Sequence, residues 1–465
     1  MRTKRLSFIA LIVLLAAALL AGCSSGNGGG SGGSGGSTGS AGSGSAGSGQ
    51  TGSASGGGSG AGADNASEQP KQPVKLTFSI WGSDAHKNMY QAMIDEYKKL
   101  HPHVDVEIMT IPIADYAQKL SVMMATKTEP DVFWLMERAI PQFLEAGQLA
   151  DLSVLKSDPD YKFDDFYPST LELFTKDGNI HGIPFSTPPN MIYYNKTMFR
   201  EKGLKTPSEL YQEGKWTYDA MLDAAAKLTD NSQGIYGINF IRPNQWSITW
   251  SETMFTILWA HGADYFSEDK KSFILDSPEG EAAFQLFSDM MFKSKVHPMP
   301  GDQTTFETGK IAMQNELFSY MGKAREIKDF EWDIAPMPEG KAGRGTTLGY
   351  AGYTVSNSTP HKEEAIEFLK FLSNPDNMKI TSQFFVPSRK SVLESDVFLD
   401  QGPSRESVKS AVLDQMANAK VRPVFENFQQ IDEVMRRNMD MVFTQRHPIP
   451  EIIQIMKNEV SPLLK

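Results

Sequence analysis

Three neighbouring side chains in the first third of the chain could bind a polyhydroxyl molecule. Trp134 lies in the apolar run 132–135, and Glu137 and Arg138 follow Trp134 three and four positions later. A sugar presents flat C–H patches and hydroxyl groups, so its site needs aromatic faces for the first and planar charged hydrogen-bonding groups for the second. The same spacing fits another arrangement, in which Trp134 lies in the core and the two charged residues are solvated at the start of a helix.

Two further groups offer similar chemistry. Trp81 follows an alternating apolar segment and precedes Asp84, and it could contact a ligand or pack equally well. Trp246, Trp250 and Glu252 lie just before or at the start of an expected helix and could form an aromatic and acidic platform. Amphipathic helices also bury tryptophans, so packing stays open for this second group.

The residue types that support catalysis or metal binding are not arranged for it. None of the eight histidines forms a pair at helical metal-ligand spacing, and His101-Pro102-His103 predicts a turn. The acidic stretch 158–165 lacks the glycine and the terminal glutamate of a calcium loop. We therefore expect no catalytic residue, no metal and no cofactor.

The N-terminus has the features of an export signal. Arg2, Lys4 and Arg5 precede the apolar run 6–20, which is too short to span a membrane stably. The run ends in Leu-Ala-Gly before Cys23, an order that resembles the bacterial lipoprotein box, so residues 1–23 are expected to be a lipoprotein signal peptide with a lipid such as palmitate on Cys23. Because Cys23 is the only cysteine, the folded part has no disulfide to stabilise it.

Residues 24–69 are nearly all Gly, Ser and Ala, a composition that predicts a flexible linker. A chain of this length has an expected r.m.s. span of about 35–40 Å. The formal net charge of −11 argues against nucleic acid and against a basic membrane-binding face. We therefore expect attachment through the lipid, on the extracellular face of the cell membrane, and the long tether favours a Gram-positive cell.

Beyond the linker, segments with strand and helix periodicity alternate. The expected strands are 74–80, 104–108, 132–135, 191–194, 235–240, 311–313 and 332–334. The expected helices are 84–100, 114–125, one around 140–146, one ending at Gly203, 217–228, 248–260, 282–292, 365–372 and 434–442. This alternation predicts mainly parallel sheets covered by helices. About 395 residues exceed what one core normally holds, so we expect two α/β domains.

The order of several short motifs resembles the family-1 extracellular solute-binding proteins of ABC importers, which include the maltose-binding protein. The motifs are Asp131-Val132-Phe133-Trp134, Gly182-Ile183-Pro184-Phe185, Tyr193-Tyr194-Asn195-Lys196, Trp216-Thr217-Tyr218-Asp219, Gly309-Lys310-Ile311-Ala312-Met313 and the segment 349–355. The resemblance covers nearly the whole chain after the linker.

This resemblance implies a two-lobed, periplasmic-binding-protein-like type II fold, in which each lobe is a mostly parallel sheet flanked by helices and several hinge segments cross between the lobes. Lobe 1 would comprise 70–187 and 349–373, and lobe 2 would comprise 188–348 and 374–465. Ligands of open α/β sheets bind beyond the carboxyl ends of strands, where Trp81, Trp134 and Asn190 are expected to lie. Hinge closure would trap the ligand between the lobes.

The resemblance also bears on individual site residues. Positions similar to Trp134, Glu137 and Arg138 contact sugar hydroxyls in maltose-binding proteins, and Trp250 and Glu252 fall near another contact region of the family. Many relatives have Gly-Pro-Trp or Gly-Ser-Trp after the Gly309–Met313 motif, whereas this chain has the segment 315–320. A different aromatic residue would then stack on the ligand, and maltose-like specificity is in doubt. The further aromatic candidates are Phe318, Tyr320, Tyr350 and Phe428.

The expected function is therefore that of a monomeric, non-enzymatic receptor that binds a sugar or oligosaccharide and delivers it to the transmembrane subunits of an ABC importer. One alternative is the same fold with a polyamine, peptide or metal chelate as ligand, since Glu137 and Glu252 are acidic. Another is a secreted lipoprotein glycoside hydrolase, which would need two carboxylates about 5–10 Å apart across the sugar.

Overall fold

The computed structural model of the chain describes residues 72–241, 246–425 and 427–464, and the side chains at 114, 169, 246–252 and 429 are not described. The expected signal peptide, the lipidation site Cys23 and the linker 24–69 therefore lie outside the described residues. Residues 68–465 form one compact unit, and all three hydrophobic clusters of the described chain lie within it. In the described part of the chain, no helix is long and apolar enough to cross a membrane.

The first sheet has five strands in the order β2-β1-β3-β13-β6. Their bounds are β1 Val74–Ile80, β2 Val104–Thr110, β3 Val132–Met136, β6 Ile183–Ser186 and β13 Ala351–Val355. β1 runs parallel to β2 and β3, whereas β13 runs antiparallel to β3 and β6. Strand β13, residues 351–355, comes from a distant part of the chain. It pairs within a sheet whose other strands all lie in residues 74–186.

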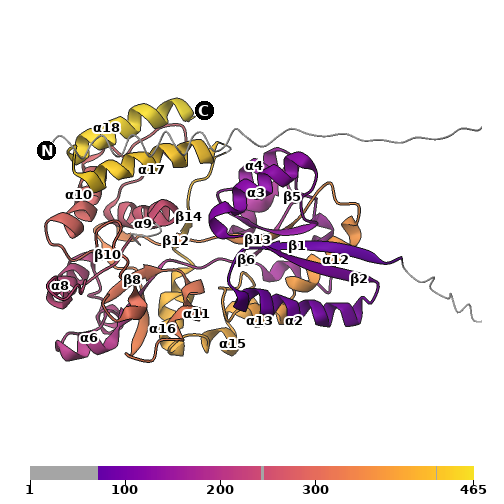
Figure 1. Cartoon of the computed structure of the whole chain (residues 1–465), viewed down its shortest axis with the longest axis horizontal. Helices are drawn as coiled ribbons and strands as arrows, with labels where there is room; N and C mark the ends of the chain where they lie inside the picture. The colour runs from indigo at the N-terminus through magenta and orange to yellow at the C-terminus, as the bar shows by residue number, and fades with distance from the viewer. Residues whose placement is uncertain (1–71, 242–245, 426, 465) are drawn as a thin grey trace, which may run out of the picture. The chain divides into compact units, whose positions relative to one another are not determined.

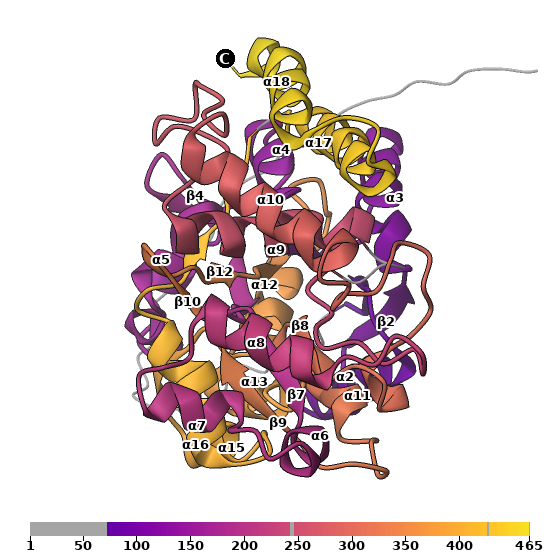
Figure 2. The same ribbon diagram turned by 90° about the vertical axis from the view of Figure 1, so that its left-hand side faces the viewer.

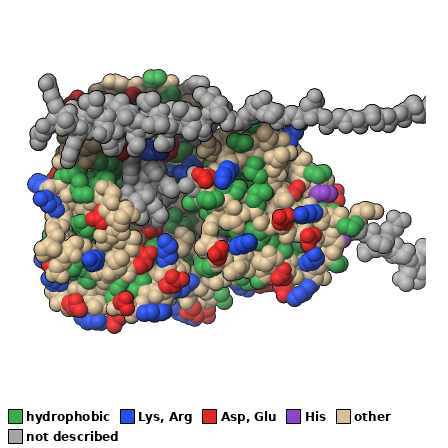
Figure 3. Space-filling model, in the orientation of Figure 1, with side chains coloured by type: hydrophobic (Ala, Val, Ile, Leu, Met, Phe, Trp, Pro, Cys, Tyr) green, Lys and Arg blue, Asp and Glu red, His purple; other side chains and the backbone are tan. Residues whose placement is uncertain are grey.

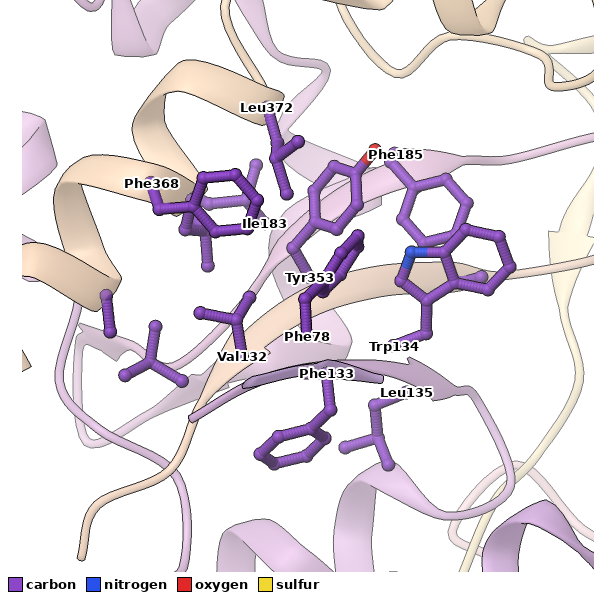
Figure 4. Packing of buried hydrophobic residues seen from close by; sticks show 14 of the residues in the cluster. Phe78, Val132, Phe133, Trp134, Leu135, Ile183, Phe185, Tyr353, Phe368 and Leu372 are labelled. Atoms are coloured by element: carbon purple, nitrogen blue, oxygen red, sulfur yellow. The ribbon is translucent and has the colours of Figure 1, made fainter. Parts of the chain in front are cut away.

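Helices cover both faces of this sheet. They are α2 Asp84–Leu100, α3 Ile113–Thr126, α4 Ile140–Glu145, α12 Lys362–Leu372 and α13 Pro375–Thr381. Figure 1 shows α3 and α4 on one side of the sheet and α2 and α13 on the other. The core between the layers is rich in aromatic rings: Phe78 packs edge-on against Tyr90 at 5.4 Å and against Phe368 at 5.5 Å between ring centroids. Figure 4 shows Phe78 beside Tyr353 in this core.

The second sheet has three strands in the order β8-β7-β9, and both of its pairings are antiparallel. The strands are β7 Met191–Asn195, β8 Met313–Glu316 and β9 Trp332–Pro336. Successive side chains of a strand point to opposite faces. Accordingly, Ile192 and Tyr194 belong to one hydrophobic cluster, and Met191 and Tyr193 belong to another. This sheet therefore has a separate core on each face.

The helices around the second sheet are α6 Lys196–Glu201, α7 Pro207–Gln212, α8 Tyr218–Leu228, α9 Trp246–His261, α10 Pro278–Phe292, α11 Met321–Ala324, α14 Lys390–Leu393, α15 Asp396–Leu399, α16 Arg405–Ala411, α17 Phe428–Thr444 and α18 Ile449–Val460. α17 and α18 lie side by side in both ribbon views (Figures 1 and 2). They belong to the same cluster as α8 and α10. The C-terminal segment is therefore part of the second core and completes one of its faces.

The remaining elements are short. They are α5 Pro168–Leu171, β4 Thr175–Lys176, β5 Asn179–Ile180, β10 Glu339–Gly340, β11 Gly343–Arg344, β12 Thr347–Leu348 and β14 Lys420–Val421. β4 pairs with β5 and β10 with β11 in antiparallel hairpins, whereas β12 pairs in parallel with β14. The β12–β14 pair matters for the site because it joins two segments that connect the cores.

Several connecting segments run side by side between the first core and the other two. The amide of Thr187 donates to the carbonyl of Val386 at 3.0 Å, and the amide of Gly349 donates to the carbonyl of Pro188 at 2.8 Å. Val421 packs on the first cluster, and Phe425 packs on the second. Four segments, near 187, 349, 386 and 421, thus form a hydrogen-bonded group of connections.

One change of core comes later than the sequence suggests. Met378, Phe385 and Val392 belong to the first cluster, although the expected lobe 1 ends at residue 373. Val386 belongs to the third cluster. Helix α13 therefore packs with the first core, and the segment 385–393 contacts both the first and the third core. The proposed lobe boundaries themselves stay a prediction.

The α/β class with helices on the sheet faces is confirmed, but two expectations about strands are wrong. The sheets are not mostly parallel, because β13 returns antiparallel and the second sheet is antiparallel throughout. The expected strand 235–240 forms only isolated bridges, at Ile235, Tyr236 and Asn239, and those of Tyr236 and Asn239 are with residues 311 and 314. Between them, the amide of Ile238 donates to the carbonyl of Val296, so the ladder toward β8 is interrupted. β8 itself starts at Met313, two residues later than expected.

Candidate functional site

A buried ion pair lies directly after β3. The Glu137 carboxylate accepts a hydrogen bond from the Arg422 guanidinium, and each residue is only 7% exposed. Arg422 follows β14, 285 positions away in sequence. The backbone amide of Glu137 also donates to the carbonyl of Tyr350 at 3.1 Å. The turn after β3 is therefore held by two of the connecting segments, through its backbone and through its side chain.

Arg138 lies beside this pair and is half-buried. Its Nε donates to the Sδ of Met136 at 3.0 Å, a weak acceptor, and no carboxylate among the residues of the described chain pairs with its guanidinium. Glu137 is thus paired with Arg422, and Arg138 is a second guanidinium beside the pair that no carboxylate of the described residues neutralises. This arrangement can donate hydrogen bonds to hydroxyl or anionic oxygens.

Trp134 occupies a core position. It is 1% exposed, and its ring lies 4.8 Å from those of Trp81 and Phe185 between centroids. Figure 4 shows its indole beside Phe185. The rings of Tyr90 and Phe385 also contact it, so this structure corresponds to the packing alternative that the sequence left open. Stacking of Trp134 on a ligand would require these neighbours to move.

Trp81 and Asp84 are more accessible. Trp81 is half-buried at the end of β1, with its edge contacts to Tyr116 at 4.9 Å and to Trp134 at 4.8 Å. Asp84 is exposed in the first turn of α2. Of the predicted aromatic residues whose side chains are described, Trp81 retains the largest accessible part, because Trp134, Phe318, Tyr320, Tyr350 and Phe428 are all buried. Trp81 is therefore the best-placed described ring for ligand stacking.

Asn190 joins a buried polar network at the edge of the second sheet. Its Nδ2 donates to Asn315 Oδ1 at 3.0 Å, and its Oδ1 accepts from Thr347 Oγ1 at 2.8 Å. Asn315 Nδ2 in turn donates to Thr253 Oγ1 of α9 at 2.9 Å. The network links a connecting segment, strand β8 and helix α9. In this structure Asn190 is 2% exposed, so it positions these elements.

The aromatic residues expected after the departure from the family motif are packed in the third cluster. Phe318 is fully buried and lies 5.1 Å from Phe398, and Tyr320 lies 5.0 Å from Tyr193. Tyr350 is buried against Phe174 at 5.6 Å. Burial raises the pKa of the Tyr320 and Tyr350 hydroxyls well above the ordinary range, so both stay neutral. Neither the ring of Phe318 nor that of Tyr320 is open to a ligand here.

Phe428 is 9% exposed at the start of α17. The side chains of Trp246, Trp250 and Glu252 lie outside the described residues, although the structure places all three on α9. The roles predicted for these four residues stay predictions.

Sequence reasoning missed Arg422 and the polar strand β8. Gln314, Asn315 and Glu316 follow one another in a strand whose four residues are all buried. Three consecutive buried polar residues are unusual, since such groups must be hydrogen-bonded. The sequence itself shows this polar run. It does not show the pairing of Arg422 with Glu137, because that contact joins residues 285 positions apart.

No group of three or more potential metal ligands occurs within the described ranges. A pocket of about 420 Å³ is lined by Lys196, Phe330, Glu331, Trp332, Asp333, Pro403 and Ser404. It lies at β9 and the start of α6, and it contains none of the predicted site residues. Figure 3 shows acidic and basic side chains interspersed on the visible face.

Comparison with known proteins agrees with this fold. The family described as bacterial extracellular solute-binding protein matches residues 83–379. The arabinooligosaccharide-binding protein of Bacillus subtilis (strain 168) is 23% identical over 388 residues, which cover 76% of this chain and 84% of the relative.

Two solved structures have the same fold. The ABC substrate-binding protein Lmo0181 from Listeria monocytogenes, in complex with cycloalternan, aligns with a TM-score of 0.75 and 24% identity over 84% of this chain and 99% of its own. Maltose-bound T. maritima MalE3 aligns with a TM-score of 0.73 and 24% identity over 84% and 100% of the two chains. Because the family match spans well over half of the sequence, the chain belongs to the bacterial extracellular solute-binding proteins.

Proposed function

We propose that the protein captures an uncharged sugar or oligosaccharide between two lobes and delivers it, chemically unaltered, to the transmembrane subunits of an ABC importer. The observation that carries this proposal is the group of four connecting segments between separately packed cores, with Trp81 and Arg138 at the adjoining edge of the first sheet. Such connections permit hinge closure, which couples ligand binding to a change that a transporter can recognise.

The lobes are proposed as 70–187 with 349–373 and 188–348 with 374–465. The membership of Met378 and Phe385 in the first cluster supports extending lobe 1 to about residue 385. Trp81 would stack on the C–H face of a sugar, and Arg138 would donate to its hydroxyls. Glu137 and Asn190 would hold the surrounding segments in place.

The ligand class rests on similarity and on charge. The three relatives described above are named for, or solved with, an arabinooligosaccharide, cycloalternan or maltose. The pairing of Glu137 with Arg422 removes one of the two acidic groups that favoured a polyamine. A sugar is therefore better supported than a cationic solute.

We also propose that the protein binds its ligand without catalysing a reaction on it. The family and the solved relatives are binding proteins. Glu137 is engaged in an ion pair, so it is poorly placed to act as a general acid or nucleophile of a glycosidase.

The mature protein is proposed to be a monomer attached to the extracellular face of the membrane by a lipid, such as palmitate, on Cys23. The Gly/Ser-rich linker 24–69 would let the folded part reach away from the membrane surface. The family description as extracellular supports this location.

A thermal-shift screen of residues 68–465 tests the proposal. Arabinooligosaccharides, maltooligosaccharides and cycloalternan are compared with spermidine. A ligand at 100 times its Kd stabilises the folded state by about 2.7 kcal/mol, which is readily measured. We expect stabilisation by one oligosaccharide class and its recovery intact by chromatography. Cleavage products, or stabilisation by spermidine alone, would overturn the proposal.

A further inference from the structure

Arg422 lies in a segment that contacts both cores. Val421 packs on the first cluster, and Phe425 packs on Phe266 of the second at 4.9 Å. The backbone amide of Lys420 donates to the carbonyl of Thr346 at 2.9 Å. The side-chain ammonium of Lys420 lies 5.6 Å from the ring centroid of Trp259. The backbone around Arg422 is thus fixed on both sides, and its guanidinium is directed at the turn after β3.

The partner of Arg422 is equally fixed. Glu137 begins the turn after β3, and its amide is bonded to the carbonyl of Tyr350 at 3.1 Å. Both side chains are about nine-tenths buried, at 7% and 10% exposure. A buried carboxylate is costly unless it is paired, and a guanidinium is the side chain best suited to pair with it. The ion pair of Glu137 and Arg422 is therefore part of the packed structure at this edge.

The pair changes the charge that the edge presents. Without Arg422, Glu137 and Arg138 would be a balanced pair of neighbours, and Glu137 would be open to a cation. With Arg422 in place, the Glu137 carboxylate is neutralised and the half-buried Arg138 keeps its charge, since no carboxylate in the described ranges pairs with it. Such an edge favours ligands that accept hydrogen bonds and disfavours cations.

We propose that Arg422 is a specificity-determining positioning residue, which occupies Glu137 and thereby selects uncharged polyhydroxyl ligands over polyamines. This inference rests on the proposed function and names the ligand class of the same site. Arg422 acts through Glu137 and Arg138, whose positions it sets, and it does so from a segment that connects the cores.

The test uses residues 68–465 as wild type and as Arg422→Gln, Arg422→Lys and the uncharged double variant Glu137→Gln/Arg422→Gln. Arg344→Gln is a matched control, because Arg344 is also largely buried and pairs with Glu339 at 3.5 Å, in the β10–β11 hairpin. Calorimetry measures the affinity of each variant for the oligosaccharide found in the screen and for spermidine.

We expect Arg422→Gln to lose at least tenfold in oligosaccharide affinity and to gain measurable spermidine binding. The double variant should lose the spermidine binding and recover oligosaccharide affinity to within about threefold, and Arg422→Lys should remain close to wild type. Arg344→Gln should alter stability without changing ligand preference. A purely structural role for Arg422 would lower stability but would not create spermidine binding.

The outcome distinguishes this inference from the proposed function. If no oligosaccharide binds the wild type, the proposed function fails, but spermidine binding that appears in Arg422→Gln and disappears in the double variant would still support the charge role of Arg422. If Arg422→Gln keeps wild-type oligosaccharide affinity, or if it binds no spermidine, the inference is overturned. If Arg422→Gln does not fold, Arg422→Lys provides the test, because lysine keeps the positive charge. Loss of oligosaccharide affinity in Arg422→Lys, without any spermidine binding, would then overturn the inference.

Discussion

The two sheets differ in the side chains that pack at their edges. At the first sheet, the rings of Trp81, just after β1, of Trp134 in β3 and of Phe185 in β6 pack against one another. At the second sheet, Asn190 and Asn315 form a network of amide and hydroxyl hydrogen bonds. The aromatic edge derives its stability from buried apolar area, and the polar edge derives its geometry from matched donors and acceptors.

This difference has a consequence for binding. Apolar packing tolerates small rearrangements, whereas a hydrogen-bonded network has a defined geometry that is lost when one member is removed. We therefore expect substitutions in the aromatic edge to lower stability most, and substitutions in the polar edge to affect the positions of the connecting segments as well.

Trp134→Ala should destabilise the aromatic edge by about 3–5 kcal/mol, because it removes a large buried ring and leaves a cavity. Chemical denaturation of residues 68–465 measures the loss. Trp134→Phe is the control, and it should cost clearly less because most of the apolar volume is kept. If the alanine variant is as stable as wild type but loses ligand binding, Trp134 acts as a ligand contact and not as a core residue.

Asn315→Leu should cost about 1–3 kcal/mol, since it leaves Asn190 and Thr253 without their bonds to the amide. Because Asn190 belongs to a connecting segment, ligand affinity should fall too. The matched control is Asn438→Leu, which removes a fully buried amide of α17 at a distance from the connecting segments. Equal losses of affinity in the two variants would contradict the positioning role of the network.

Acid should lower the stability of the protein through the buried His297. Burial lowers the pKa of His297 from 6.5 to about 4, while its Nε2 accepts from the amide of Ile241 at 3.0 Å. The neutral form is favoured in the folded state, so this stabilisation is complete above pH 6.5 and is lost as pH falls from 6.5 toward 4. Between pH 7 and 5 the loss should be about 2 kcal/mol.

Denaturation curves at several pH values measure this effect, and His297→Gln should flatten the dependence. The pKa of His86, at the aromatic edge, is also lowered by burial, so the comparison is best made in a His86→Gln background. An unchanged pH dependence in the His297 variant would show that another group is responsible.

The smallest effect is expected at the exposed pair Lys75–Glu107, which joins β1 to β2 at 2.7 Å. Solvent screens both charges, so Lys75→Ala should change the free energy of unfolding less than any of the substitutions above. The same denaturation assay, repeated in high salt, provides the check. A larger loss would mean that this outer strand pair contributes more to the first sheet than the aromatic core suggests.

Sequence periodicity predicted most elements, because their apolar spacing is regular. Helix α8 begins at Tyr218 with Thr217 as its N-cap, next to the expected start at Thr217. β1 was also placed correctly, since Val74, Leu76, Phe78 and Ile80 are buried in the alternation of a strand. Such patterns depend on residues that are close in sequence, so they can be read without knowing the tertiary structure.

The failures concern contacts between distant residues. Strand direction depends on how β13 returns to pair with β3, which is a tertiary property. An aromatic residue at the end of a strand can face a ligand or its own core, and the residue type does not distinguish the two, as Trp134 illustrates. The sequence therefore proposes which residues could line a site, and the structure adds which of their side chains are accessible.

Small-angle X-ray scattering of residues 68–465, with and without a saturating oligosaccharide from the screen, measures whether the lobes close on a ligand. We expect a smaller radius of gyration with ligand, because the lobes close around it. A bound, saturating ligand that leaves the radius of gyration unchanged would contradict this expectation.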